Sequence, residues 1–216
     1  METTQTPAAL STDDPRHRFG RGVAIATQVI GAIRPDQLDL PTPCPEYDVR
    51  GLLGHMVGAM RRVVAMGEGR NPLSVVPMVD GVPDDGWPQA WAEVAHACQA
   101  AFTDDAALEQ EVVLPWRTGT AAEQLLGYLN EVTVHTWDLA QATGQDPEWD
   151  PEVLETAWAA IHTSLPVAER ADLFEAITAN LPAGVPAPPR AFADAVPVPD
   201  DAPMIERLVA WNGRQP

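Results

Sequence analysis

The chain of 216 residues contains no lysine, because all 13 of its basic residues are arginine. Without a lysine amine, Schiff-base mechanisms and the lysine-dependent type of phosphate-binding loop are excluded. Acidic residues number 31, which gives a formal net charge of -18 at pH 7. Such a charge repels phosphate backbones and anionic lipid surfaces. We therefore expect neither a nucleic acid nor a membrane as a partner.

Cysteines and long apolar runs are also scarce. The two cysteines, Cys44 and Cys98, can form at most one bridge, and we interpret them as reduced thiols in a chain without a secretion signal. No apolar stretch approaches the roughly 20 residues of a membrane-spanning helix. Residues 1–14 are polar and acidic, without the basic start and apolar centre of a signal peptide. The sequence thus predicts a cytoplasmic protein.

The length suits one domain with a sizeable core. We predict a flexible N-terminus over residues 1–13 and one helical domain over residues 14–180. Residues 181–216 are predicted to form a proline-rich strap and a terminal helix that packs on the bundle. The expected fold class is all-α, a helical bundle with an additional C-terminal helix and an extended tail.

Capping signals divide the domain into helices. Aspartate followed by proline at positions 14–15 and 150–151 predicts two helix starts, and Asp48 is suited to cap another. Thr120 and Glu123 have the spacing of a capping box, and Gly144 can end the helix that follows. The expected helices cover residues 15–33, 49–68, 87–108, 120–143 and 151–164. Residues 71–86 are expected to form a long loop that covers part of the protein.

The tail has two parts with different composition. Proline is frequent over residues 181–203, and the Val-Pro-Val-Pro run that begins at Val196 is typical of an extended strap. The short helix expected over residues 204–211 has an apolar side, formed by Ile205, Leu208, Val209 and Trp211. We expect this helix to dock on the bundle and to hold the strap across it.

The helix expected over residues 120–143 carries an unusual polar stripe. At about 100° per residue, five polar or amphipathic side chains fall on one face: Gln124, Tyr128, Glu131, His135 and Asp138. The adjoining face is expected to meet the core through Leu125, Leu129, Val132 and Leu139. Unpaired polar groups beside a core cost roughly 1 to 3 kcal/mol each. Something is therefore expected to satisfy the stripe.

A metal ion would satisfy it. Glu131 and His135 are four residues apart, the helical spacing that points two ligands at one ion. His55 lies just outside the apolar stripe of the helix expected over residues 49–68 and is a third candidate. Two imidazoles and one carboxylate form the ligand set of catalytic zinc, with a position left for water or substrate. Small residues beside His55 are expected to leave room for the ion and a substrate: Gly51, Gly58 and Ala59.

Ordinary interpretations of the same residues remain open. His55 also fits a satisfied surface or core histidine, and Glu131 with His135 fits a helical polar pair worth a few tenths of a kcal/mol. Asp138 fits a helix cap or an ion pair with an arginine. Cys44 fits either a reactive thiol in a loop or a small buried hydrophobe.

Three stretches resemble an actinobacterial family of DinB-like metal-binding proteins: TPCPEYDVRGLLGHMVGAMRR, LNEVTVHTWDLAQATG and VPVPDDAPMIERLVAWNGRQP. This family is similar to the N-terminal metal domain of mycothiol-dependent maleylpyruvate isomerase. The resemblance implies a four-helix bundle of the DinB and YfiT kind. It also implies a metal bound by a histidine of the second helix and an acid plus a histidine of the fourth, which here are His55, Glu131 and His135.

The resemblance further implies the cofactors and the chemistry. We expect a divalent metal, zinc, with nickel, iron and cobalt as alternatives, and mycothiol as cosubstrate. The first hypothesis is a metal-dependent thiol S-transferase or isomerase that aims a metal-bound thiolate at a small electrophile. The alternatives are a metal- or small-molecule-binding protein without turnover, and a metal-water hydrolase or lyase.

Other residues are expected to assist the metal ligands. Gln124, Tyr128 and Asp138 are the polar groups next to them on the same stripe. The isomerase has a further C-terminal domain that contributes an arginine to its active site, and we do not expect that domain in this chain. Arg62, or Arg117 in the loop before residue 120, is the candidate anion contact in its place. The expected partners are a small-molecule substrate and a low-molecular-weight thiol, bound to a monomer or homodimer.

Overall fold

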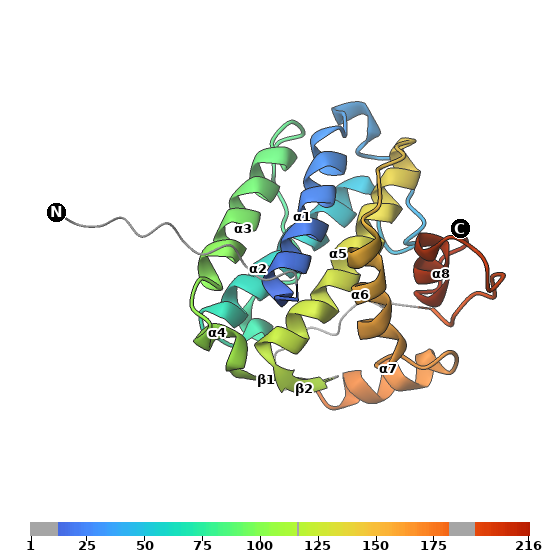
Figure 1. The fold of residues 1–216 in the computed structure, drawn as a ribbon. Helices are drawn as coiled ribbons and strands as arrows, with labels where there is room; N and C mark the ends of the chain where they lie inside the picture. Colours follow the sequence, from blue (N-terminus) through green and yellow to red (C-terminus); the bar gives the residue numbers. More distant parts are fainter. Residues whose placement is uncertain (1–12, 116, 182–192) are drawn as a thin grey trace.

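The computed structural model of the chain describes residues 13–115, 117–181 and 193–216. The predicted flexible N-terminus up to residue 12, and residues 182–192 of the predicted strap, lie outside the described residues. The described part consists of eight α-helices, two short 3-10 helices and one small hairpin (Figure 1). The predicted all-α fold class is confirmed.

Four helices form the bundle: α1 (Pro15–Gly31), α2 (Val49–Gly67), α3 (Trp87–Ala101) and α5 (Ala121–Thr143). Helices α1 and α2 each pack against both α3 and α5. The core fills the space between them, and the predicted inward face of α5 is buried there through Leu125, Leu129, Val132 and Leu139. Figure 1 shows α5 running diagonally beside α1 through the middle of the molecule.

The predicted helix starts are confirmed by their capping contacts. The Asp14 carboxylate accepts a hydrogen bond from the Arg16 amide, and the Asp48 carboxylate accepts one from the Gly51 amide. At the start of α5, Thr120 and Glu123 form the expected capping box. Gly144 ends α5 in the left-handed region with φ of 70°, a conformation that glycine adopts without steric cost.

The region between α3 and α5 differs from the prediction. The helix expected to reach residue 108 ends at Ala101, and a separate short helix α4 (Ala106–Glu109) follows. Thr103 donates a hydrogen bond to the Ala100 carbonyl and Asp104 accepts one from the Ala106 amide. Such bonds from short polar side chains compete with the helical pattern, which explains the break.

A hairpin that the sequence analysis did not predict follows α4. Strands β1 (Glu111–Leu114) and β2 (Arg117–Thr120) pair antiparallel, with Glu111 opposite Thr120. Along β1, Val112 and Leu114 face inward. The prediction that Arg117 lies in a loop was therefore wrong, because it lies in β2.

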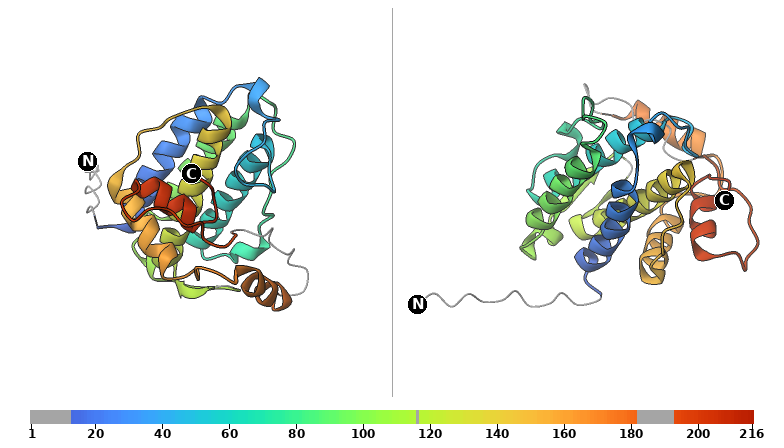
Figure 2. Two further views of the ribbon diagram at one scale, coloured as in Figure 1. Left: turned by 90° about the vertical axis from the view of Figure 1, so that its right-hand side faces the viewer. Right: turned by 90° about the horizontal axis from the view of Figure 1, so that it is seen from above.

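Three further helices follow the bundle: α6 (Pro151–His162), α7 (Arg170–Ala179) and α8 (Met204–Trp211). Helix α6 packs on α5 and α1, and α8 packs on α6 and α5 (Figure 2). The prediction of a helix over residues 204–211 is confirmed, with Leu208, Val209 and Ala210 buried. Helix α7 was not predicted.

The two short 3-10 helices are η1 (Pro35–Gln37), which lies between α1 and α2, and η2 (Pro72–Ser74), which lies between α2 and α3.

None of the helices in the described ranges combines the length and the apolar character needed to cross a bilayer.

Candidate metal centre

Helices α2 and α5 bring the three predicted ligands together. His55 Nε2 lies 3.0 Å from Glu131 Oε1, and the rings of His55 and His135 meet edge to face with centroids 5.1 Å apart. One ligand atom from each of His55, Glu131 and His135 lies within 4.8 Å of the others. Ligands held at zinc-bond lengths lie about 3.4 Å apart around the ion, so this donor set fits a divalent metal with little movement.

The cluster is buried unevenly. The side chain of His135 is 4% exposed, whereas those of His55 and Glu131 are 14% and 26% exposed. His135 therefore forms the inner end of the cluster and Glu131 the end nearest to solvent.

The protonation states suit metal binding. Burial opposes the charge of Glu131, but the hydrogen bond from His55 and the nearby charges of His55, His135 and Arg62 bring its pKa down to about 2. The pKa of His135 is lowered as well, in this case by burial, although the carboxylate of Asp138 acts in the opposite direction. Near neutral pH, Glu131 is ionised and His135 is uncharged, which are the forms that bind metals.

Asp138 orients the His135 ring. Its Oδ2 lies 3.0 Å from His135 Nδ1, so the carboxylate accepts a hydrogen bond from Nδ1–H and leaves Nε2 without a proton to face the cluster. Arg214, after the end of α8, donates to both oxygens of Asp138 at 3.2 and 2.9 Å. Burial raises the pKa of Asp138, but the bonds from His135 and Arg214 outweigh it and keep that pKa low. The interpretation of Asp138 as an ion-pair partner of an arginine is confirmed.

Two neighbours of the site were missed in the sequence. The ring of Tyr47 stacks on His55 at a centroid distance of 5.2 Å and an interplanar angle of 18°. Burial raises the pKa of Tyr47 to about 12, so it stays protonated. Arg214 was missed as well, because no spacing along the chain connects position 214 with position 138. The quoted terminal stretch ending in WNGRQP was the only signal that pointed to this segment.

The remaining candidate residues divide into two groups. Tyr128 precedes Glu131 by three residues on α5, and burial and the charge of Glu131 both raise the pKa of Tyr128. The charge of Arg62 acts in the opposite direction on Tyr128 and lowers the pKa of Glu131. Gln124 instead donates to the Arg117 carbonyl at 3.3 Å, and Arg117 pairs with the Glu123 carboxylate at 3.7 Å. Of the two candidate anion contacts, Arg62 is the one whose charge acts on Glu131, and Arg117 belongs to the hairpin.

The expected free space beside His55 is occupied by the chain itself. A Cβ atom at Gly58 would lie 2.3 Å from the Pro77 carbonyl oxygen, and one at Gly51 would lie 3.2 Å from the ring of Tyr47. The loop predicted to cover part of the protein thus lies directly on α2. The prediction that Gly51 and Gly58 leave room for an ion and a substrate was wrong, because these glycines make room for backbone and for Tyr47.

A second group of possible ligands, Cys44, His135 and Asp138, shares two residues with the machinery described above. The guanidinium of Arg214 already supplies the positive charge there. Burial raises the pKa of Cys44 to about 12, and its thiol donates to Glu46 at 3.4 Å. Cys44 is a buried, protonated thiol, and both Cys44 and Cys98 are free, as predicted.

The comparisons with known proteins agree with this geometry. The model of the family described as mycothiol maleylpyruvate isomerase N-terminal domain matches residues 19–140, which include His55, Glu131, His135 and Asp138. Two uncharacterized proteins of Mycobacterium tuberculosis, from strains CDC 1551 / Oshkosh and H37Rv, are each 29% identical over 203 residues. The match spans 93% of this chain and 98% of each relative. No solved structure matches.

Proposed function

The chain belongs to the mycothiol maleylpyruvate isomerase N-terminal domain family, and from this premise we propose that it is a metal-dependent enzyme using mycothiol. The proposed reaction is a thiol S-transfer to a small electrophile, or its thiol-dependent isomerisation. The observation that carries the proposal is the convergence of His55, Glu131 and His135 from two facing helices. Three protein ligands leave a position open for another molecule, as catalytic sites require.

The proposed ligands are His55 Nε2, a carboxylate oxygen of Glu131 and His135 Nε2. When bound, a divalent metal would act as a Lewis acid that lowers the pKa of a thiol beside it. We propose zinc, although this mixed nitrogen and oxygen set also accepts nickel, iron or cobalt. Asp138 accepts a hydrogen bond from the His135 ring, and Tyr47 stacks on the His55 ring, so each proposed imidazole ligand has a neighbour outside the ligand set that restrains it.

Arg62 is the proposed contact for an anionic group of the substrate. Its Nε is buried and has no hydrogen-bond partner among the described residues. A buried guanidinium nitrogen without an acceptor is costly, and a carboxylate would satisfy it in bidentate geometry. Because the charge of Arg62 acts on Glu131, such a group would lie on the Glu131 side of the proposed metal site.

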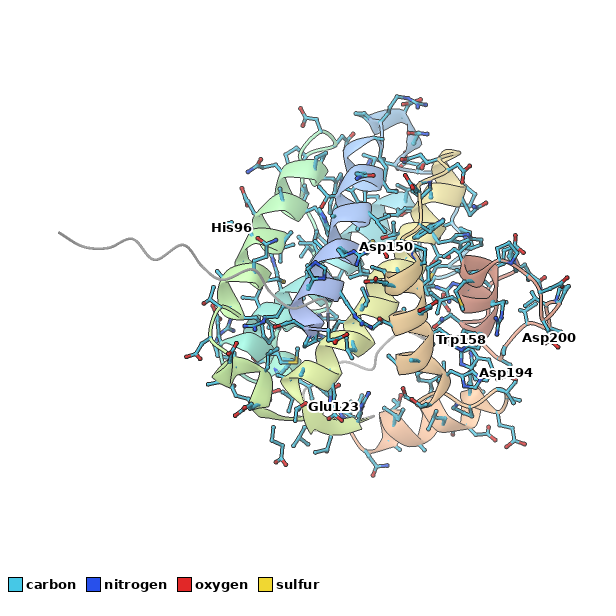
Figure 3. All side chains as sticks on the ribbon, in the orientation of Figure 1. His96, Glu123, Asp150, Trp158, Asp194 and Asp200 are labelled. Carbon is cyan, nitrogen blue, oxygen red and sulfur yellow. The ribbon has the colours of Figure 1, made fainter. Side chains whose placement is uncertain are left out.

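Metal content tests the ligand assignment. The purified protein should contain stoichiometric divalent metal by elemental analysis, and His55→Ala and His135→Ala should lose it. His96→Ala is the matched control, because His96 is exposed on α3 (Figure 3), whereas the three proposed ligands belong to α2 and α5. Stoichiometric metal in both ligand variants would reject the assignment.

Activity measurements test the thiol. With metal bound, the protein should turn over at least one member of a panel of epoxides, quinones, activated sugars and maleylpyruvate, and only when mycothiol is present. Turnover without any thiol would favour a metal-water hydrolase or lyase. Ligand binding without product across the panel would favour a protein that binds without catalysing.

A further inference from the structure

The segment after α8 reaches into the bundle and contacts the inner end of the metal centre. The side chain of Arg214 is 4% exposed and that of Asp138 is fully buried. Arg214 Nε donates to Asp138 Oδ1 at 3.2 Å and Arg214 Nη2 donates to Asp138 Oδ2 at 2.9 Å. Arg214 lies outside residues 19–140, the part of the chain that matches the family.

The backbone around Arg214 is held in place from both sides. The amides of Asn212 and Asn130 on α5 exchange two buried hydrogen bonds of 3.1 and 3.0 Å. Gly213 follows with φ of 81°, and a Cβ there would lie 2.8 Å from the Ala193 carbonyl oxygen. This position therefore requires glycine, and the turn that it makes is followed directly by the inward-pointing Arg214.

Helix α8 is itself fixed to its surroundings. Arg170, fully buried, donates to the Trp211 carbonyl at 2.6 Å, and the Val196 amide donates to the Ala210 carbonyl at 2.9 Å. In Figure 3, Trp158 and Asp194 lie on the same side of the molecule as α8. The position of Arg214 is thus set by a docked element and not by a freely moving end.

Two partners fix the orientation of the Asp138 carboxylate. A guanidinium fork that holds both carboxylate oxygens fixes the plane of the carboxylate. Oδ2 also lies 3.0 Å from His135 Nδ1, so fixing that plane fixes the direction in which His135 points. Partners of metal-binding histidines commonly contribute 10- to 100-fold, in order of magnitude, to metal affinity.

We propose that Arg214 is a positioning residue of the metal centre, which holds both oxygens of Asp138 and thereby keeps His135 Nε2 directed at His55 and Glu131. The inference rests on the proposed metal site and extends it to the C-terminal segment. The docked tail is then part of the site, although it contributes no ligand. Loss of the Arg214 fork weakens metal binding without removing a ligand.

Zinc affinity and a cobalt spectrum of the full chain test this inference. Arg214→Gln should lose about 10- to 100-fold in zinc affinity, measured by competition with a chelator. With cobalt in place of zinc, its visible absorption should shift, because the His135 ring is no longer held. Arg214→Lys should lie between wild type and Arg214→Gln, since lysine keeps the charge but offers no fork.

Arg207→Gln is the matched control. Arg207 belongs to α8, the helix just before Arg214, and lies over the ring of Trp158 at 5.0 Å, but among the described residues no hydrogen bond or ion pair joins it to Asp138. It should match wild type in affinity and spectrum.

Two results separate the failure of this inference from the failure of the metal site. If wild-type protein binds zinc and Arg214→Lys and Arg214→Gln bind it equally well with unchanged cobalt spectra, the positioning role is rejected and the metal site stands. If wild-type protein binds no divalent metal, both are rejected. If Arg214→Gln fails to fold because the charge of Asp138 is left uncompensated, Arg214→Lys retains the charge and tests the inference alone. Wild-type zinc affinity and an unchanged cobalt spectrum in Arg214→Lys would then reject the positioning role.

Discussion

Charge compensation differs among the residues around the metal centre. Glu131 accepts a hydrogen bond from His55, whereas Asp138 is held by a hydrogen bond to His135 and an ion pair with Arg214. The charge of Arg62 acts on Glu131, yet the buried Nε of Arg62 has no hydrogen-bond partner among the described residues. A buried donor without an acceptor is costly, and this cost is the basis of the proposal that an anionic ligand supplies the acceptor.

Replacing Arg62 tests this interpretation. Arg62→Gln should raise KM for an anionic electrophile about 10- to 100-fold, the equivalent of losing one hydrogen bond to a charged group, while zinc content stays unchanged. Arg61→Gln is the control, because Arg61 is the adjacent residue of α2 and is exposed. An unchanged KM in Arg62→Gln, or an equal effect in Arg61→Gln, would contradict the assignment.

Asp14 allows a prediction about pH that is independent of the metal. Hydrogen bonds from the Arg16 side chain hold the pKa of Asp14 below its ordinary value. Because the folded pKa is depressed, the stabilisation is present above the unfolded pKa of about 4 and is lost as pH falls through the folded pKa. Asp14→Ala should lower the free energy of unfolding by about 0.5 to 2 kcal/mol at pH 7. Urea unfolding should show this difference constant from pH 5 to 8 and smaller below about pH 4; a gap that widens in acid would reject it.

At the scale of elements, the loop between α2 and α3 depends on two glycines of α2. The Val79 amide donates to the Gly54 carbonyl at 3.1 Å, and the Pro77 backbone lies against Gly58. A Cβ atom at Gly54 would lie 2.5 Å from the Val79 carbonyl oxygen, and one at Gly58 would lie 2.3 Å from the Pro77 carbonyl oxygen. Neither atom fits unless the loop is displaced. The loop therefore packs as closely as a neighbouring helix would.

Gly58→Ala should destabilise the protein although alanine favours helices. Displacement of the loop should cost about 1 to 3 kcal/mol, which corresponds to a fall in melting temperature of roughly 2 to 12 °C for a chain of this size. Gly20→Ala in α1 is the control, because nothing lies within 4 Å of its Cβ position, and it should be neutral or slightly stabilising. Equal melting temperatures for the two variants would show that the loop does not resist displacement.

Some helix ends could be predicted from capping signals, and others depend on side-chain bonds to the backbone that capping signals do not reveal. The capping box at Thr120 and Glu123 and the glycine at position 144 were sufficient to place both ends of α5, and the wheel of α5 placed Glu131 and His135 on one face. The end of α3 depends on Thr103 and Asp104 competing for backbone groups. Helical propensity alone does not reveal that competition.

In the candidate site, some residues could be found from their spacing along the chain and others only from the packing of distant segments. Glu131 and His135 lie four residues apart in one helix, so the sequence alone predicted that they share a face. His55 could be proposed from its place on another helix. The stacking of Tyr47 and the fork of Arg214 depend on how distant segments pack, and no periodicity encodes them. The glycine interpretation at Gly58 was wrong for the same reason, since a small residue leaves room equally for a ligand or for another stretch of backbone.

At the scale of the whole molecule, the C-terminal segment closes one side of the bundle. Helix α8 covers parts of α6 and α5 (Figure 2), and Arg170 donates to the Ala193 and Trp211 carbonyls from a fully buried position. The prediction that residues 14–180 and 181–216 behave as a domain and its strap stays a prediction, as does the idea that the strap limits access to the metal. The contacts of Arg170 and Arg214 give both ideas a physical basis.

Deleting residues 181–216 tests whether the tail is an integral part of the fold. The deletion uncovers the apolar surface under Leu208 and Val209 and removes two carbonyl acceptors from the buried Arg170 guanidinium. Burial of two such side chains contributes about 3 to 6 kcal/mol, so the melting temperature should fall on the order of 10 °C. The truncated protein should also bind a hydrophobic dye. It should keep the three ligands but hold zinc less tightly, because Asp138 has lost Arg214.

Leu208→Ala in the full chain is the control. It leaves Arg214 present and should lower the melting temperature with a smaller effect on zinc affinity. If the truncated protein melts at the wild-type temperature and protease rapidly removes the tail from the full chain, the tail is a solvated appendage and Arg214 cannot be held as described.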